Sequence, residues 1–303
     1  MRNLILFIFL FAFKIVSAVD SPPGKAVLNA YINVQDIWDL NLKNGTYQID
    51  FYLILENEGH SFPAVEIMNG KVDIDTIEKN GKFLELRIKG ELRADFNYEN
   101  FPLDNEFIKI VLEGKKDRVD KVELCSKAHQ NTISEKPHLL GWRVGEIASK
   151  TETHLYTEVE NDGKSHPYLF SRVTYSIPIQ REGRYGYLFK MLLPTIIAIL
   201  IIFIGFKLPH RQIEPRMNIS LGSLFVIVSN LIITQNFIPE IATATLIEKL
   251  NYCSLIFVVS IIYIFSMSFN HRENEEKVKR IERRGAIISS IIYVFLLIVI
   301  ALI

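Results

Sequence analysis

Residues 214–240 read EPRMNISLGSLFVIVSNLIITQNFIPE, and this stretch decides the fold. No side chain from Met217 to Pro239 ionises, and a helix of that length crosses the roughly 30 Å hydrocarbon core of a bilayer. The stretch nevertheless carries many amides and hydroxyls, which a helix surrounded by lipid avoids. We therefore expect a membrane-spanning helix with one special face.

Six residues of this stretch recur at steps of four, three, four, three and four, so they share one face of a helix. They are Asn218, Gly222, Phe225, Ser229, Ile232 and Asn236. Because polar groups inside a membrane normally face a bundle interior or a water-filled path, this stripe predicts a pore lining. Ordinary packing between helices, which also uses Ser, Gly and Asn, is an equal alternative from the stripe alone.

Several copies of this helix around an axis would turn each residue into a ring. Phe225 and Ile232 would then form apolar levels that gate by dewetting. Glu214 lies just outside the stripe, where a ring of carboxylates favours cations, and Arg216 is its neighbour.

The N-terminus has the features of a secretory signal. Arg2 precedes the apolar run Leu4–Phe13, and Val16-Ser17-Ala18 provides a small-residue cleavage site. We expect residues 1–18 to be removed and the mature chain to begin near Val19, outside the cytoplasm.

Composition divides the remaining chain into two domains. The segment 19–185 is charged, whereas charge-free runs crowd the segment 186–303. We expect an aqueous domain over 19–185 and a membrane domain over 186–303, with helices at about 187–207, 217–238, 250–269 and 285–303.

The aqueous domain has the alternation of half-buried strands. Apolar residues occupy every second position of Tyr47–Leu55 and of Leu84–Ile88, and the pairs Asn44-Gly45, Asn69-Gly70 and Asn80-Gly81 suit tight hairpin turns. The sequence predicts an extracellular, antiparallel, immunoglobulin-like all-β sandwich followed by a four-helix transmembrane bundle. Asn44-Gly45-Thr46 also fits a glycosylation acceptor, but we favour the turn.

Basic residues between the helices predict the topology. The connectors 207–216 and 270–284 hold more Lys and Arg than the connector 240–249, so both are expected in the cytoplasm, with both ends of the membrane domain outside. The mixed-sign run Arg272–Arg284 is interpreted as a short solvated helix or loop in preference to a lipid-binding switch.

Several function classes find no support. The formal net charge of zero gives no reason to expect a nucleic-acid partner. Cys125 and Cys253 lie in different domains, so no intrachain disulfide is expected. We find no metal-binding spacing, phosphate loop or nucleophile–base constellation, and therefore expect neither a cofactor nor an enzyme. An enzyme attached to a membrane anchor remains a further alternative, after a channel and a non-conducting receptor.

The order of these parts resembles the pentameric ligand-gated ion channels, the Cys-loop receptor superfamily. Phe101–Asp104 looks like the family's Phe-Pro-hydrophobic-Asp signature, and Leu192–Pro194 matches the Leu-Pro of its first membrane helix. Phe62–Asn69 resembles the Trp-x-Pro segment, and Leu140–Trp142 resembles a Gly-Trp of bacterial members. The missing cysteine pair and the short cytoplasmic connector are similar to the prokaryotic branch.

The resemblance implies a homopentamer, in which four further copies join this chain around a pore lined by the second helix. It also implies gating coupling through Pro102 and Asp104, through Arg181 or Arg184, and through Pro239. A carboxylate and a guanidinium there would form a pair that shifts as domains rotate. A static ion pair of little energetic consequence is the alternative.

The family binds ligands between subunits with aromatic side chains. Here Phe62 replaces the usual Trp, and the segment from Leu55 to Phe62 is short. Tyr156 and Tyr168 flank the turn 161–164, where the family's capping loop would lie, although both can equally be ordinary sandwich aromatics.

Together these features predict a cation-selective channel in a bacterial inner membrane, surrounded by lipid and gated by a small extracellular ligand or protons. Glu214-Pro215-Arg216 is a mixed selectivity pattern, and Phe225 stands where the family mostly has Leu or Ile. A non-conducting receptor that senses through the sandwich is the alternative.

Overall fold

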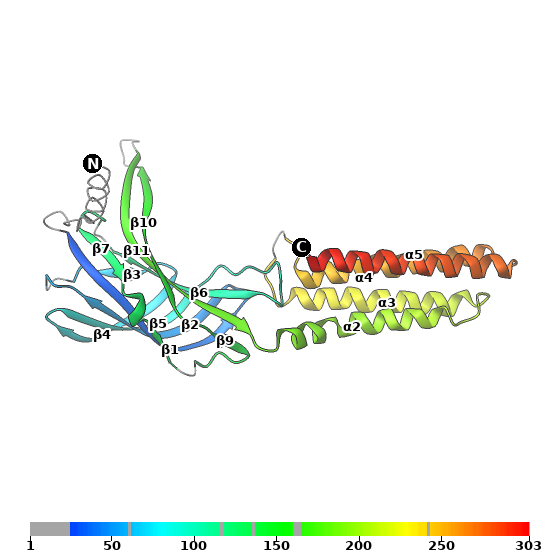
Figure 1. Ribbon diagram of the computed structural model, residues 1–303, viewed down its shortest axis with the longest axis horizontal. Helices are drawn as coiled ribbons and strands as arrows, with labels where there is room; N and C mark the ends of the chain where they lie inside the picture. The colour runs from blue at the N-terminus through cyan, green and yellow to red at the C-terminus, as the bar shows by residue number, and fades with distance from the viewer. Residues whose placement is uncertain are drawn as a thin grey trace, which may run out of the picture.

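A computed structural model describes residues 25–59, 62–115, 118–134, 137–159, 165–240 and 243–302. The expected signal peptide lies outside these residues. Figure 1 shows an elongated molecule with two β-sheets at one end and four long helices at the other. The predicted fold class, a β-rich N-terminal region followed by a four-helix region, is confirmed.

The first sheet has the strand order β4-β5-β2-β1-β7, with β8 beside β1. Its strands are β1 (Ala26–Asn41), β2 (Thr46–Glu56), β4 (Gly70–Asn80), β5 (Phe83–Arg93), β7 (Val122–Ser126) and β8 (Thr132–Ile133). Strand β1 runs parallel to β7 and to β8, so the expectation of a wholly antiparallel sandwich was wrong at this edge. The segment between β6 and β9 returns alongside β1 instead of forming a hairpin with it.

The second sheet has the order β10-β11-β6-β3, with β9 beside β11. Its strands are β3 (Val65–Ile67), β6 (Asn105–Gly114), β9 (Trp142–Val144), β10 (Ala148–Val159) and β11 (Ser165–Arg181). All its neighbouring strands are antiparallel. Strand β11 leads directly towards the first long helix, so this sheet is the one joined covalently to the helical region.

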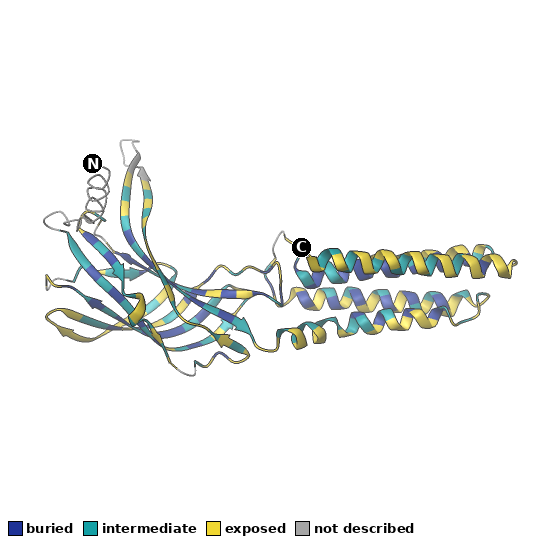
Figure 2. Ribbon diagram, viewed as in Figure 1, coloured by how far each residue is buried: buried dark blue, intermediate teal, exposed yellow. Residues whose placement is uncertain are grey.

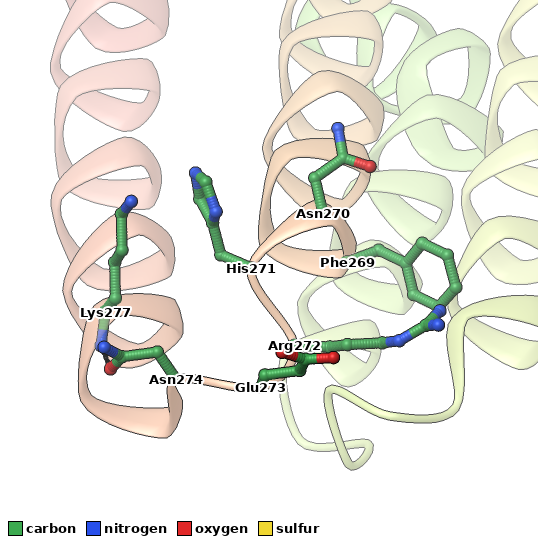
Figure 3. A pocket seen from close by; sticks show the side chains of 7 residues that line it. All are labelled: Phe269, Asn270, His271, Arg272, Glu273, Asn274 and Lys277. Atoms are coloured by element: carbon green, nitrogen blue, oxygen red, sulfur yellow. Dashed lines mark hydrogen bonds between the residues drawn. The ribbon is translucent and has the colours of Figure 1, made fainter.

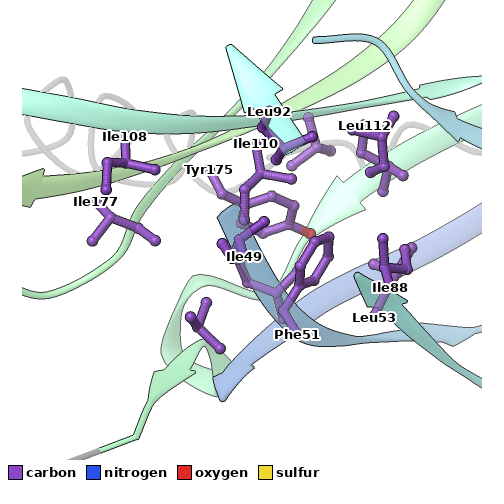
Figure 4. Close-up of a cluster of buried hydrophobic side chains, with 14 of the residues drawn as sticks. Ile49, Phe51, Leu53, Ile88, Leu92, Ile108, Ile110, Leu112, Tyr175 and Ile177 are labelled. Carbon is purple, nitrogen blue, oxygen red and sulfur yellow. The ribbon is translucent and has the colours of Figure 1, made fainter. Parts of the chain in front are cut away.

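The alternating side chains of β2 fill the space between the sheets. The apolar set from Tyr47 to Leu55 is almost completely buried and packs with residues of β5, β6 and β11, as Figure 4 shows for part of the cluster. Each large apolar side chain removed from water stabilises the fold by about 1.5–3 kcal/mol. The buried Tyr47 hydroxyl donates to the Lys109 carbonyl at 2.6 Å, so its polar end is satisfied.

Two of the three expected Asn-Gly turns join adjacent strands. Gly45 and Gly81 have φ angles of 63° and 44°, in the left-handed region that glycine tolerates. The third pair differs, because Asn69-Gly70 carries the chain from β3 in one sheet to β4 in the other. The Asn69 amide donates to the carbonyls of Arg93 at 2.7 Å and Lys109 at 2.6 Å, and so bridges the sheets.

The four helices are α2 (Arg184–Gly205), α3 (Ile213–Gln235), α4 (Leu246–Asn270) and α5 (Glu275–Leu302). Each is long and apolar enough to cross a membrane. Helix α5 begins at Glu275, before the expected start near residue 285, because the charged residues continue the same helix. Asn274 accepts from the Lys277 amide at 3.0 Å, and Glu275 pairs with Lys279 one turn on.

The two regions meet where the loop before β6 touches the start of α4. The Leu246 amide donates to the Glu99 carbonyl at 2.9 Å, and the Ile247 amide donates to the Phe101 carbonyl at 3.4 Å. Tyr98, Phe101, Ile238 and Ile247 form a buried apolar cluster beneath these bonds. Figure 2 shows the contrast between the buried strand positions of the sandwich and the exposed outer faces of the helices.

Candidate pore helix and coupling region

The six residues of the stripe on α3 all lie on a face that the chain itself leaves uncovered. Asn218, Gly222, Phe225, Ser229, Ile232 and Asn236 are exposed in the single chain. Apart from its own turn of helix, no heavy atom of the described chain lies within 4 Å of the position that a Gly222 Cβ would take. In the described part of the subunit, no packing contact therefore accounts for the polar side chains of the stripe.

A second face of α3 does pack inside the subunit. Its buried residues are Arg216, Ser220, Ser223, Ile227, Asn230 and Thr234. The Ser223 hydroxyl donates to the Ala198 carbonyl of α2 at 3.0 Å. Helix packing by small and polar residues therefore exists here, but it uses residues other than the stripe.

Asn230 lies at the centre of a buried polar cluster that ties three helices together. Its amide donates to the Met191 carbonyl at 3.0 Å and to the Thr195 hydroxyl at 3.1 Å. The Thr195 hydroxyl in turn donates to the Asn251 side-chain oxygen on α4 at 2.7 Å. Pro194 lies in this turn of α2 and lacks an N–H, so the polar cluster supports a weakened stretch of helix.

The two charged residues at the start of α3 point in different directions. Glu214 is exposed, whereas Arg216 is only 2% exposed. Arg216 donates from Nε to the Leu208 carbonyl at 3.0 Å, forms an ion pair with Glu282 of α5, and lies over the Phe265 ring at 5.0 Å. Arg216 is therefore neutralised inside the subunit, whereas the Glu214 charge is exposed.

Glu282 is a residue that the sequence reasoning missed. It belongs to the run Arg272–Arg284, which we expected to be a short solvated segment. Most of that run is indeed exposed, but Val278 is buried and Glu282 reaches Arg216. No periodicity links two positions so far apart in the chain, so only the three-dimensional structure shows their pairing.

The connection between α4 and α5 forms a polar pocket of about 440 Å³ at the far end of the bundle. Figure 3 shows its lining side chains, with Arg272 beside the Phe269 ring at 4.5 Å. His271 and Lys277 come from the ends of the two helices. The pocket lies at the end of the bundle away from the sandwich and no stripe residue lines it, so we assign it no part in the site.

The coupling residues gather where the sandwich meets the helices, but Asp104 does not form the expected ion pair. Pro102 and Asp104 are buried, and both Asp104 carboxylate oxygens lack a hydrogen-bond partner within the described chain. Arg181 instead lies over the rings of Trp142 at 4.3 Å and Tyr187 at 4.5 Å. Aromatic faces therefore hold Arg181, one of the two arginines that the resemblance offered as a partner for a carboxylate.

Burial lowers the pKa of Arg181, while Tyr187 and Asp104 oppose that effect. Arg181 and Tyr187 line a pocket of about 300 Å³ together with Asn236 and Phe237 from the outer end of α3. Arg181, at the base of the sandwich, and Asn236, the last residue of the stripe, therefore line the same pocket. Arg184 lies nearby, 3.4 Å from the Leu103 carbonyl, and Pro239 is half-buried.

The aromatic residues proposed for a ligand site are already occupied by neighbours in the same chain. Tyr156 and Tyr168 lie opposite each other on β10 and β11. Arg118 lies 3.8 Å from the centre of the Tyr168 ring, and Arg172 donates to the Tyr156 hydroxyl at 3.0 Å. Phe62 packs against the sandwich core, and the turn 161–164 lies outside the described residues. These three residues therefore do not present free aromatic faces in one subunit.

Within the described ranges, no group of three or more His, Cys, Asp or Glu side chains could hold a metal ion. Cys125 and Cys253 are both free thiols.

A search of protein-family models and a search of curated proteins found no match to this chain. The architecture of two sheets and four apolar helices fits a channel-like or receptor-like membrane protein.

Proposed function

We propose that this chain is the subunit of a homopentameric, cation-selective channel whose pore is lined by the exposed stripe of α3. The proposal places the sandwich outside a bacterial inner membrane, with lipid around the bundle and a small ligand or protons as the stimulus. The observation that carries it is the exposure of all six stripe residues. Their amides and hydroxyls have no partner inside the described part of the subunit, so contact with water in a shared pore explains them best.

Ordinary packing between helices was the alternative to a pore, and the contacts inside the described part of one subunit do not account for the stripe. The residues that pack α3 against α2 and α4 are those of its other face. Exposure to lipid would leave Asn218, Ser229 and Asn236 without hydrogen-bond partners in hydrocarbon, which is unfavourable. Symmetric copies of the stripe around an axis would avoid that cost, because each polar side chain would then face water.

The electrostatics at the start of α3 support selectivity for cations. Glu214 and Arg216 are close in sequence and opposite in charge, but Arg216 is buried against Glu282. A ring of exposed Glu214 side chains would attract cations at the pore mouth without a competing ring formed by Arg216. We therefore expect Glu214→Gln to reduce the preference for cations.

Two serines on opposite faces of α3 provide the sharpest test. Ser229 lies on the stripe, whereas Ser223 is 3% exposed and donates to Ala198. Each serine is changed to cysteine in a background carrying Cys125→Ser and Cys253→Ala, and the purified protein is placed in liposomes. A water-soluble, positively charged thiosulfonate should block the current of Ser229→Cys and leave that of Ser223→Cys unchanged.

Currents are recorded while pH and then small amines are varied, since the stimulus is not fixed by the structure. A reversal potential that follows the cation gradient supports selectivity. If the wild type is silent, Phe225→Ala removes the bulkiest ring of the proposed pore and should allow current. A protein that is pentameric by native mass, and that stays silent both as the wild type and as the Phe225→Ala variant, would contradict the pore and favour a non-conducting receptor.

A further inference from the structure

Two acidic side chains that form no ion pair with a cation of the described chain lie together at the junction of the sandwich and the helices, with Arg181 near enough to Asp104 to be affected by its charge. Asp104 ends the loop before β6, and Glu106 is two positions further, on the same side of the strand. They are 5% and 2% exposed. Both Asp104 oxygens and the Glu106 Oε1 lack a partner within the described chain, while Glu106 Oε2 accepts from the Asn97 amide at 3.1 Å.

The charged groups around this acid pair do not neutralise it. Arg181 of β11 is held by aromatic rings, and Arg184 of α2 lies against Tyr185 and the Leu103 carbonyl. The loop before β6 contributes Tyr98 and Asp95. Burial together with Glu106, Asp104 and Asp95 raises the pKa of Tyr98 to about 12, so its phenol stays neutral.

The helices facing the pair also leave it uncompensated. Asp104 and Arg184 line a pocket of about 600 Å³ whose remaining wall includes Leu246 of α4 and Leu297 of α5. These two leucines bring no further charge. Asp104 thus lies beside a space large enough to hold water, although its two carboxylate oxygens are themselves buried.

Two carboxylates in contact cannot both remain charged at low cost when they are removed from water. Burial, together with contact with the Asp104 carboxyl, raises the pKa of Glu106 to about 8 against the opposing effect of the Asn97 amide. One proton between the two carboxyls would supply the donor that the oxygens without a partner need.

We propose that Asp104 and Glu106 form a proton-binding site that joins the sandwich to the helix bundle. One shared proton keeps the pair at a single negative charge and keeps the loop before β6 docked on α4. Loss of that proton leaves two buried charges and weakens the docking. The effect on current rests on the proposed channel function, whereas proton binding and docking do not.

The direction of the pH effect follows from linkage. The folded pKa of Glu106 lies above the ordinary value of a carboxyl group, so the folded state holds the proton after the unfolded state has lost it. The contribution of this site to stability is therefore complete below the unfolded pKa of about 4.3, and it is lost as pH rises towards about 8. Mild acidification should tighten the junction.

Infrared difference spectra of the full-length protein in vesicles test for the proton directly. The wild type should show a protonated carboxylic acid that disappears as pH rises through about 8, and Glu106→Gln should remove this signal. Glu113→Gln is the matched control, because Glu113 is also 2% exposed on β6 but accepts from the Arg172 Nε at 2.7 Å. A signal that persists unchanged in Glu106→Gln overturns the site.

Hydrogen exchange of the peptide containing Leu246 and Ile247 tests the docking, since their amides bond to the loop. Protection in the wild type, relative to Glu106→Gln at each pH, should fall by at most about tenfold per pH unit as pH rises from 6 towards about 8, and should level off above that pH. Equal protection in both proteins from pH 6 to about pH 9 overturns the coupling of the proton to docking. Glutamine resembles the protonated acid in shape, so this variant should fold.

Current measurements separate this inference from the proposed function. A proton signal without any current contradicts the channel and leaves the site intact. A current whose pH dependence is the same in the wild type and in Glu106→Gln shows that the site does not regulate the channel. A shift of that pH dependence in Glu106→Gln alone, and not in Glu113→Gln, supports regulation through this pair.

Discussion

The two faces of α3 share the same spacing but differ in what surrounds them. The exposed stripe and the buried face both recur at steps of four, three, four, three and four, and the buried face is the more polar of the two. Ser220, Ser223, Asn230 and Thr234 all find hydrogen-bond partners within the subunit. In the described part of the chain, the side chains of Asn218, Ser229 and Asn236 have none. Polarity by itself therefore does not distinguish the two faces, whereas the presence or absence of hydrogen-bond partners within the described chain does.

Helix α5 provides a third face for comparison. Its exposed residues are apolar through the second half of the helix and include Ile287, Ile291, Phe295 and Ile298. Such a surface suits contact with lipid chains. The exposed stripe of α3 differs from this surface because half of its side chains are polar. Matched pairs of substitutions on the different faces can test whether they have different surroundings.

The largest effect is expected from breaking the ion pair on the buried face. Arg216→Met leaves Glu282 as an unpaired, mostly buried charge, which should destabilise the protein by about 3–5 kcal/mol. Thermal and denaturant unfolding of the purified protein measure this change. Replacing both partners, as Arg216→Met with Glu282→Leu, should restore most of the stability. A single variant as stable as the wild type would show that the pair does not hold α3 to α5.

A charge introduced on each exposed face should separate water from lipid. Ile232 and Ile291 are 57% and 63% exposed, on α3 and α5 respectively. Ile291→Asp should cost about 3 kcal/mol and lower the yield of folded protein, because a carboxylate near the middle of a lipid-facing helix is strongly disfavoured. Ile232→Asp should assemble nearly normally and increase cation conductance. Equal loss of folded protein in both variants would place the α3 stripe in lipid.

The sequence predicts local patterns well, because each depends on residues close together in the chain. Alternation along β2 identified the sandwich core, and the charge-free runs identified all four helices. The stripe was found by its helical spacing. The spacing did not show that its polar groups lack partners, since the other face of α3 has the same spacing and only packing distinguishes them.

Contacts between distant segments were the part that the sequence could not supply. The pairing of Arg216 with Glu282 joins two helices through positions that no periodicity relates. The resemblance implied a pair between Asp104 and either Arg181 or Arg184; Arg181 lies among aromatic rings and forms no ion pair with Asp104, although the Asp104 charge still acts on it, because burial favours flat, weakly hydrated contacts for a guanidinium. Glu106 is a charged strand residue for which the sequence did not predict burial, yet the side chain is buried beside Asp104.

A smaller effect is expected from the two asparagines at the outer end of α3. Asn230→Leu removes the donor to Met191 and leaves Thr195 and Asn251 with a disrupted network, which should cost about 1–3 kcal/mol. Asn236→Leu removes no hydrogen bond of its side chain within the described subunit and should change stability by less than about 0.5 kcal/mol. Single-channel conductance should respond in the opposite order, with Asn236→Leu reducing it more. Identical effects on stability would remove the distinction between the two faces.

The smallest effect on stability is expected at the two serines. Ser223→Ala removes one neutral hydrogen bond to Ala198 and should cost about 1 kcal/mol, whereas Ser229→Ala removes none and should be nearly neutral. Unfolding measurements on proteins differing by a single oxygen atom per subunit allow this comparison. In a pentamer, however, Ser229→Ala would remove a whole ring of hydroxyls from the pore, so it should lower conductance while leaving stability unchanged. A variant that loses conduction without losing stability marks a residue that contacts the permeating ions, and Ser223→Ala should show the reverse.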